Sequence, residues 1–84
     1  MKHEVYAIYN RKHGKVYIGQ TVDVDSRLEL HRNKKFAHSY TARFDGAWEL
    51  IYREEVADRK QALVRERQLK SYQGRVFVKK FIPR

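Results

Sequence analysis

The fold is decided by a stretch near the N-terminus that reads EVYAIYNRKHGKVYIGQT, residues 4–21. Aliphatic and aromatic residues fill both of its ends, and His13-Gly14 between them is a turn signal, so the stretch predicts a β-hairpin. Side chains alternate between the faces of a strand, and a turn of even length keeps Tyr6 and Tyr17 on one face. Gly19 falls on that face too, and we expect it to leave a gap beside the rings for a backbone or a phosphate.

Further helix and strand patterns follow. Asp23 is a candidate N-cap for a helix that ends at about residue 31, and residues 48–54 indicate a third strand. Asp58, with Gln61 three residues on, resembles a capping box and predicts a helix whose body ends at about residue 72, with Gly74 as its stop. The tail, residues 75–84, favours a short helix that Pro83 ends.

The predicted fold class is therefore α+β, arranged as an α/β sandwich. We expect a small three-stranded antiparallel sheet flanked by helices, in the order β-β-α-(short α)-β-α-α, with the short helical turn within residues 32–46. A chain of 84 residues has material for one hydrophobic core, so residues 1–84 are expected to form a single domain.

Composition narrows the function. Nineteen Lys and Arg against ten Asp and Glu give a net charge of +9, which favours a polyanionic partner, nucleic acid first. An acidic membrane surface fits less well because the basic residues are spread along the chain, and a merely well-solvated basic surface stays open as an alternative. Without cysteine, a membrane-spanning run or a signal peptide's apolar stretch, the chain is expected to be cytoplasmic and to have no membrane partner.

An inward carboxylate is the second clue to a site. A helical wheel places Glu66 at the centre of the apolar stripe formed by Ala62, Leu63 and Leu69. Burial of a lone carboxylate costs several kcal/mol, so either Lys70 pairs with it one turn on or it faces a cation in a cleft. The pattern leaves both readings open.

Two residues of the first helix point to the same region. Arg27 and His31 are one turn apart at the edge of its apolar stripe, so both can reach a site on the sheet face. Taken alone, His31 is an ordinary core histidine and Arg27 an ordinary surface cation. Their convergence with the two tyrosines and an inward acid is what indicates a functional site.

The segment before the third strand alternates cations with aromatic residues. That alternation is typical of phosphate contacts combined with base stacking. The candidate nucleic-acid contacts in it are Arg32, Lys34, Lys35, His38, Tyr40 and Arg43.

These segments, taken in their order along the chain, resemble the motifs of the GIY-YIG nuclease superfamily. Glu4-Val5-Tyr6, Tyr17-Ile18-Gly19 and the continuation to Arg27-Leu28 and His31 look like its hallmark region. Residues 39–43, 48–50 and 62–70 are similar to its small, stand-alone URI-type endonuclease domains. The resemblance covers nearly the whole chain.

The resemblance implies a metal-dependent endonuclease that hydrolyses phosphodiester bonds in DNA, branched or single-stranded, as a monomer or weak homodimer. It implies that Tyr6 is the base that activates water, that Tyr17 supports it, and that Arg27 neutralises charge on the scissile phosphate. It also implies that Glu66 holds one Mg²⁺ or Mn²⁺ and that His31 assists proton movement. Lys70, like His38, is a further candidate for substrate contact.

Two departures keep a second function open. Glu4-Val5-Tyr6 lacks the glycine and isoleucine of the name motif. Some members carry an asparagine late in the domain, whereas this chain has only Asn10 and Asn33, so that contact is either missing or supplied by Gln73. The alternative is a non-catalytic nucleic-acid-binding module that keeps the fold and the basic surface.

Overall fold

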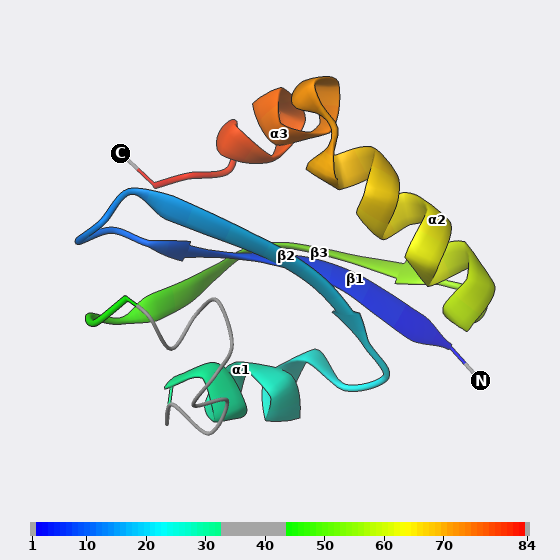
Figure 1. The fold of residues 1–84 in the computed structure, drawn as a ribbon. Helices are drawn as coiled ribbons and strands as arrows, with labels where there is room; N and C mark the ends of the chain where they lie inside the picture. The colour runs from blue at the N-terminus through cyan, green and yellow to red at the C-terminus, as the bar shows by residue number, and fades with distance from the viewer. Residues whose placement is uncertain (1, 33–43, 84) are drawn as a thin grey trace.

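A computed structural model of the chain describes residues 2–32, the last three by backbone alone, and residues 44–83 (Figure 1). The elements in it are β1 His3–Asn10, β2 Lys15–Thr21, α1 Val24–Arg32, β3 Trp48–Val56, α2 Arg59–Lys70 and α3 Tyr72–Lys79. This is the predicted α+β order. The expected short helical turn lies largely outside the described residues.

The sheet has the order β2-β1-β3, and both pairings are antiparallel. Tyr6 lies opposite Gly19 and Ile8 opposite Tyr17, so the four share one face and the predicted parity of the hairpin is confirmed. On the other side of β1, Ala7 pairs with Tyr52 and Ile8 with Leu50, which leaves one extra residue in β3 as a bulge.

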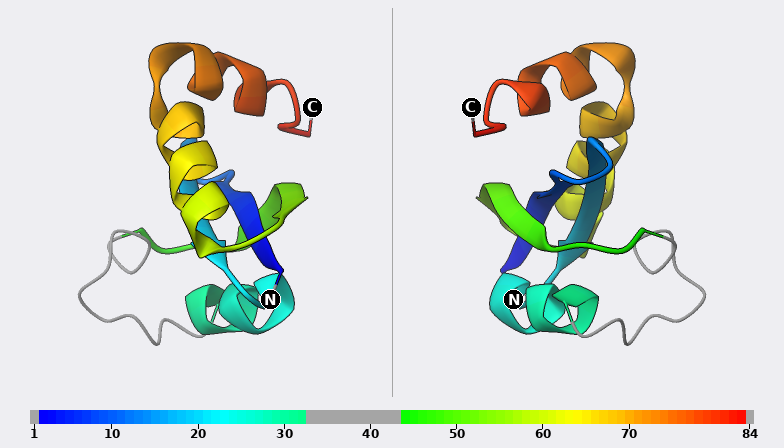
Figure 2. Two further views of the ribbon diagram at one scale, coloured as in Figure 1. Left: turned by 90° about the vertical axis from the view of Figure 1, so that its right-hand side faces the viewer. Right: turned by 90° about the vertical axis from the view of Figure 1, so that its left-hand side faces the viewer.

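The sheet forms a middle layer with helices on both faces: α2 and α3 lie on one side and α1 on the other (Figures 1 and 2). Because β1 is central, both of its faces are buried, and residues 5–8 are buried without interruption. Val5 and Ala7 pack with Ala62, Leu69 and Val78 of the helical pair. The second cluster lies on the α1 side and consists of Tyr6, Ile8, Val24, Leu28 and Trp48, with Tyr17 against it.

Both predicted N-caps are present. The Asp23 carboxylate accepts hydrogen bonds from the backbone N–H and the hydroxyl of Ser26, at 3.2 and 2.8 Å, at the start of α1. The Asp58 carboxylate accepts from the Gln61 N–H at 2.9 Å at the start of α2. Both helices therefore begin where the capping residues indicate.

The junction after α2 differs from the sequence prediction. The helix ends at Lys70, and Gly74 is not its stop but lies inside α3. Ser71 ends α2 and starts α3: its hydroxyl donates to the Gln68 carbonyl at 2.6 Å and accepts from the Gly74 N–H at 3.2 Å. A serine that caps two helices replaces the expected glycine stop because the chain turns sharply there without a left-handed residue.

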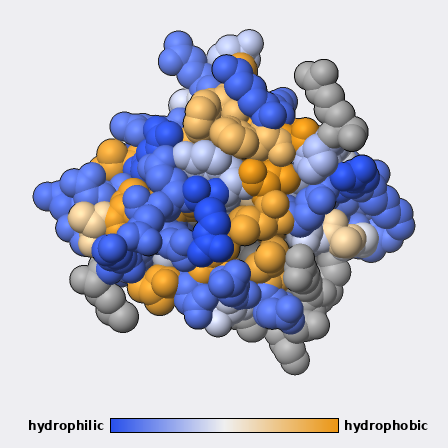
Figure 3. All heavy atoms as spheres, turned by 180° about the vertical axis from the view of Figure 1, so that it is seen from behind, coloured by the Kyte–Doolittle hydropathy of each residue, from blue (hydrophilic) through white to orange (hydrophobic). Residues whose placement is uncertain are grey.

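Two smaller predictions about the late helices need correction. Leu63, assigned to the buried stripe, is 41% exposed, because α2 packs on the sheet through Ala62 and Leu69 instead. The last helix ends at Lys79, before Pro83, and a turn of backbone bonds from Lys80, Phe81 and Ile82 follows it. A small chain cannot bury all of its apolar surface, and Figure 3 shows hydrophobic residues between hydrophilic regions on the back of the molecule.

No helix in residues 2–32 or 44–83 combines the length and the apolar character needed to cross a bilayer.

Gly74→Ala is expected to lower the free energy of unfolding by about 2–3 kcal/mol, as overpacking does. A Cβ at this position would lie 2.1 Å from the Gln68 carbonyl oxygen and 2.4 Å from the Leu69 Cα, both backbone atoms that cannot move alone. Urea denaturation measures the change. The matched control is Gln73→Ala, an exposed neighbour in the same helix; equal stability of the two variants would show that the junction is not tightly packed.

Candidate active site

Two phenols lie side by side on the α1 face of the hairpin. Tyr6 is 2% exposed, and its ring centroid is 6.3 Å from that of Tyr17, with 46° between the planes. A Cβ added at Gly19 would lie 2.7 Å from the Tyr6 hydroxyl oxygen and 3.1 Å from Tyr17 Cε2. Because Gly19 has no side chain, both rings can lie close to β2 at this position, as predicted from the place of Gly19 in the hairpin.

Both phenols are held in the protonated form. Burial, followed by the neighbouring Tyr17, raises the pKa of Tyr6 far above its ordinary value, and the charge of Glu66 raises it further. Burial and Glu66 likewise raise the pKa of Tyr17. Arg27 acts in the opposite direction and lowers the pKa of each, because a nearby cation favours the phenolate.

The position of Arg27 depends on how α1 is anchored to the sheet. One oxygen of Glu4 in β1 accepts from the Val24 N–H at 3.3 Å, at the first residue of α1. The other accepts from Arg53 Nη2 at 2.6 Å and Nε at 3.1 Å, across to β3. Glu4 thus fixes the start of the helix that carries Arg27. The sequence showed Glu4 as part of the first motif, but it did not show that Glu4 anchors the helix.

Glu66 comes from α2 and is coupled electrostatically to both phenols. Its side chain is 20% exposed, and Lys70 Nζ lies 3.5 Å from its carboxylate. The sequence left open whether Glu66 pairs with Lys70 or faces a cation in a cleft. The structure shows the ion pair with Lys70, and the cation in a cleft stays a prediction. The Glu66 charge also raises the pKa of Tyr6 and Tyr17.

The acid and the phenols come from opposite faces of the sheet. The tyrosines lie on the α1 face, whereas α2 packs on the opposite face. The outer edge of β2 is not paired with another strand among the described residues. An acid on α2 can therefore act on the phenols past this edge, so the site is at an edge and not in the middle of one sheet face.

The donor set fits a metal that needs few protein ligands. Within residues 2–32 and 44–83, no three His, Cys, Asp or Glu side chains converge to form a cage. Glu66 is the one carboxylate coupled to the phenols. Mg²⁺ is commonly bound through one or two carboxylates, with water and substrate phosphate completing its shell, so Glu66 is compatible with such an ion.

The remaining predicted residues are only partly located. The side chains of His31 and Arg32 are not described, although α1 carries both. Lys34, Lys35, His38, Tyr40 and Arg43 lie outside the described residues. The roles suggested for these residues stay predictions.

Comparison with known proteins agrees with this arrangement. The model of the GIY-YIG catalytic domain matches residues 2–80. The chain belongs to the GIY-YIG family. A GIY-YIG-type fold is also found in its structural neighbour, the UPF0213 protein BH0048 from Bacillus halodurans, solved by solution NMR. The two chains are 28% identical with a TM-score of 0.55, over 95% of this chain and 84% of that one. No curated protein matches the chain significantly.

The GIY-YIG assignment is compatible with the altered first motif. Val5, which stands directly before the first tyrosine, points into the opposite core cluster. Glu4 and Tyr6 lie on the face shared with Tyr17, where Glu4 contacts the start of α1. The valine of the changed motif therefore alters packing under α2, the glutamate anchors α1, and the phenol stays in place.

Gly19→Ala is expected to displace the Tyr6 ring and to lower the free energy of unfolding by about 1–3 kcal/mol. The closest clash is with the Tyr6 hydroxyl, so Tyr6→Phe in the same background should recover part of the loss. Near-UV circular dichroism and urea denaturation measure both effects. Gln20→Ala, the next position of β2, is the control. An unchanged tyrosine spectrum in Gly19→Ala would disprove the close contact.

The raised pKa of Tyr6 ties stability to alkaline pH. The folded state holds the phenolic proton after the unfolded chain has lost it, so this stabilisation is complete below about pH 10 and declines as the pH rises further. In urea titrations from pH 8 to 11, the parent should lose up to about 1.4 kcal/mol per pH unit more than Tyr6→Phe above pH 10. Tyr72→Phe, at a position 84% exposed, is the control. Parallel curves for parent and Tyr6→Phe would contradict the shift.

Proposed function

We propose that this protein is a Mg²⁺- or Mn²⁺-dependent endonuclease that hydrolyses phosphodiester bonds in DNA. The observation that carries the proposal is the electrostatic coupling of Glu66 and Arg27 to both phenols. Three elements supply these groups: the hairpin, α1 and α2. Family membership supports the nuclease class, and the residue roles that follow are part of the proposal.

In this proposal Glu66 holds the metal, and Arg27 holds the scissile phosphate. When bound, the ion supplies positive charge beside the phosphate oxygens and offsets the charge of Glu66. Arg27 adds a second positive charge at the phosphate, where charge develops as water attacks. Its guanidinium suits a phosphate because its donors form a planar fork.

Tyr6 is the proposed base. Water adds to phosphorus, its proton passes to the phenolate oxygen of Tyr6, and one P–O ester bond breaks as the leaving oxygen departs and takes up a proton. An ordinary phenol is ionised to about one part in a thousand at pH 7. A stabilisation of the phenolate by about 4 kcal/mol is needed to bring the pKa of the phenol down to pH 7. The raised pKa of Tyr6 increases that requirement. Burial is the largest cause of that raised pKa, so Tyr6 is a competent base only when positive charge offsets burial as well as the charge of Glu66.

The substrate is a DNA strand bound mainly through its backbone. A net charge of +9 supplies steering toward a polyanion. The segment of residues 32–43, rich in cations and aromatic residues, is proposed to bind phosphates and to stack on bases. Base-specific contacts are few in this arrangement, which favours single-stranded or branched DNA over a defined sequence.

One alternative has an observation in its favour. Lys70 already neutralises part of the Glu66 charge, and Tyr6 is strongly protonated, which also suits a module that binds nucleic acid without cleaving it. The Asn10 amide cannot replace the missing late asparagine, because it is buried in hydrogen bonds with the Asp45 carbonyl and the His13 N–H.

The test is a cleavage assay on labelled single-stranded, duplex and branched DNA with Mg²⁺, Mn²⁺ or chelator. The parent should cleave at least one substrate with metal and none with chelator. Glu66→Gln keeps the shape of the side chain and should reduce cleavage by about a hundredfold or more, the scale seen when a charge-stabilising group is lost. Tyr6→Phe should reduce it similarly.

The matched control is Glu55→Gln, which removes the charge of an exposed carboxylate on β3 that pairs with Lys2. Its cleavage rate should equal that of the parent. Equal loss in Glu55→Gln and Glu66→Gln would remove the special role of Glu66. Tight DNA binding by the parent without cleavage of any substrate, in either metal, would establish the binding module.

A further inference from the structure

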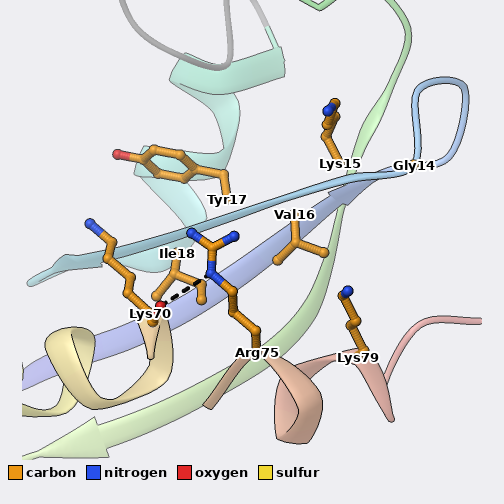
Figure 4. Close-up of a pocket in the computed structure, with 8 residues that line it drawn as sticks. All are labelled: Gly14, Lys15, Val16, Tyr17, Ile18, Lys70, Arg75 and Lys79. Carbon is orange, nitrogen blue, oxygen red and sulfur yellow. Dashed lines mark hydrogen bonds between the residues drawn. The ribbon is translucent and has the colours of Figure 1, made fainter. Parts of the chain in front are cut away.

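A second cavity lies at the free edge of β2, on the side of α2 and α3. Its volume is about 520 Å³, within the range of about 300–1,000 Å³ that is usual for pockets holding small organic ligands. We call it the β2-edge pocket. The residues that line it are Gly14, Lys15, Val16, Tyr17, Ile18, Lys70, Arg75 and Lys79 (Figure 4).

The β2-edge pocket is strongly basic. Half of its lining residues carry a positive charge, and none carries a negative one. Among the described residues, no carboxylate forms an ion pair with Lys15, Arg75 or Lys79. Ion pairs do occur at other cations, namely Lys2, Arg11, Lys12, Arg53, Arg65 and Lys70. Such a group of like charges repels itself and is stabilised by an anion.

Arg75 is oriented into this space. Its Nε donates to the Lys70 carbonyl at 3.1 Å, which fixes the plane of the guanidinium. The rest of the guanidinium points across the pocket toward β2, as Lys70 does (Figure 4). Val16 and Ile18 form an apolar wall opposite, and Ile18 is 5% exposed. A phosphate on Arg75 would therefore have an apolar surface beside it for a sugar.

Helix electrostatics explain only part of this charge. Lys70 and Lys79 stand in the last turns of α2 and α3, where cations stabilise the helix dipole. Arg75 is in the middle of α3, so it does not have that reason to be basic. Lys15 lies at the rim of the pocket: it leaves β2 on the face opposite the helices, and its Nζ is 5.7 Å from the centroid of the Phe44 ring. The convergence of Lys70, Arg75 and Lys79 on one cavity needs a further explanation.

The β2-edge pocket is continuous with the candidate active site. Tyr17 lines the pocket and also packs against Tyr6, and its ring leaves β2 on the side opposite Ile18 (Figure 4). Lys70 lines the pocket and also pairs with Glu66. A strand that passes from the two tyrosines over the edge of β2 to Lys70 therefore meets Arg75 and Lys79 next.

We propose that the β2-edge pocket binds a phosphate, with its sugar, of the same nucleic-acid strand that the active site cleaves, on one side of the scissile phosphate. This inference rests on the proposed function for the choice of ligand. The pocket acts as a positioning subsite: Arg75 and Lys79 hold the flanking backbone, so a strand must extend past the scissile bond to bind well.

The test compares Arg75→Ala/Lys79→Ala with the parent in binding a fluorescent 12-nucleotide single strand, in chelator and across a salt series. Loss of one phosphate contact should lower the slope of log affinity against log salt by about 0.7 and weaken binding by about tenfold. The loss should be smaller for a dinucleotide, which has one phosphate. Lys79→Ala alone repeats the test without removing the Arg75 hydrogen bond.

The control is Arg59→Ala/Lys60→Ala, which removes the same charge from the exposed start of α2. Slopes that fall equally in control and pocket variants would overturn the subsite, because net charge alone would then explain binding. A parent that cleaves DNA, with an unchanged slope in both pocket variants, would also overturn it and leave the nuclease proposal intact. A fall confined to the pocket variants, in a protein that cleaves nothing, would support the subsite and refute the nuclease.

Discussion

The site depends on the contact between the Tyr6 ring and the backbone of Gly19. β1 is the central strand and is buried on both faces, so its alternation commits Tyr6 to the α1 side, and the neighbouring strand must have no side chain beneath the ring. The same contact removes water from the phenol and raises its pKa. Tight packing thus positions the hydroxyl and opposes its ionisation, which makes positive charge from Arg27 and from a bound ion necessary for any base chemistry.

The edge position of β2 is the second constraint. In a wider sheet, a carboxylate on α2 would be separated from the tyrosines by another strand. Here the outer edge of β2 is open among the described residues, so Glu66 acts on phenols that belong to the opposite layer. The basic pocket uses the same edge from the α2 and α3 side. A three-stranded sheet is therefore sufficient for the site, because the hairpin that carries the tyrosines includes the edge strand β2.

The sequence predicted those features that follow from short-range periodicity. Strand alternation has a period of two, so the shared face of Tyr6, Tyr17 and Gly19 followed from the hairpin, and side-chain caps gave the starts of α1 and α2. Features set by tertiary packing were missed. Gly74 looked like a helix stop, but it is small because α2 and α3 touch there. Lys15 and Arg75 are far apart in sequence and each looks like a solvated cation, so their common cavity was not predictable.

Charge connects the stability of this protein to its ligand. A chain of this length buries a modest core, and a net charge of +9 adds self-repulsion to the compact state. Part of that repulsion is relieved internally, by ion pairs such as Arg53 with Glu4 and Arg65 with Glu54. At the β2 edge it is not relieved among the described residues, because Lys15, Arg75 and Lys79 have no acidic partner there. A polyanion that binds the folded state supplies the missing negative charge, and by mass action it stabilises the fold by an amount that grows with the logarithm of its affinity. Among the described residues, the edge is thus a place where clustered cations lack acidic partners, and for the same reason one where an extended phosphate backbone gains by binding.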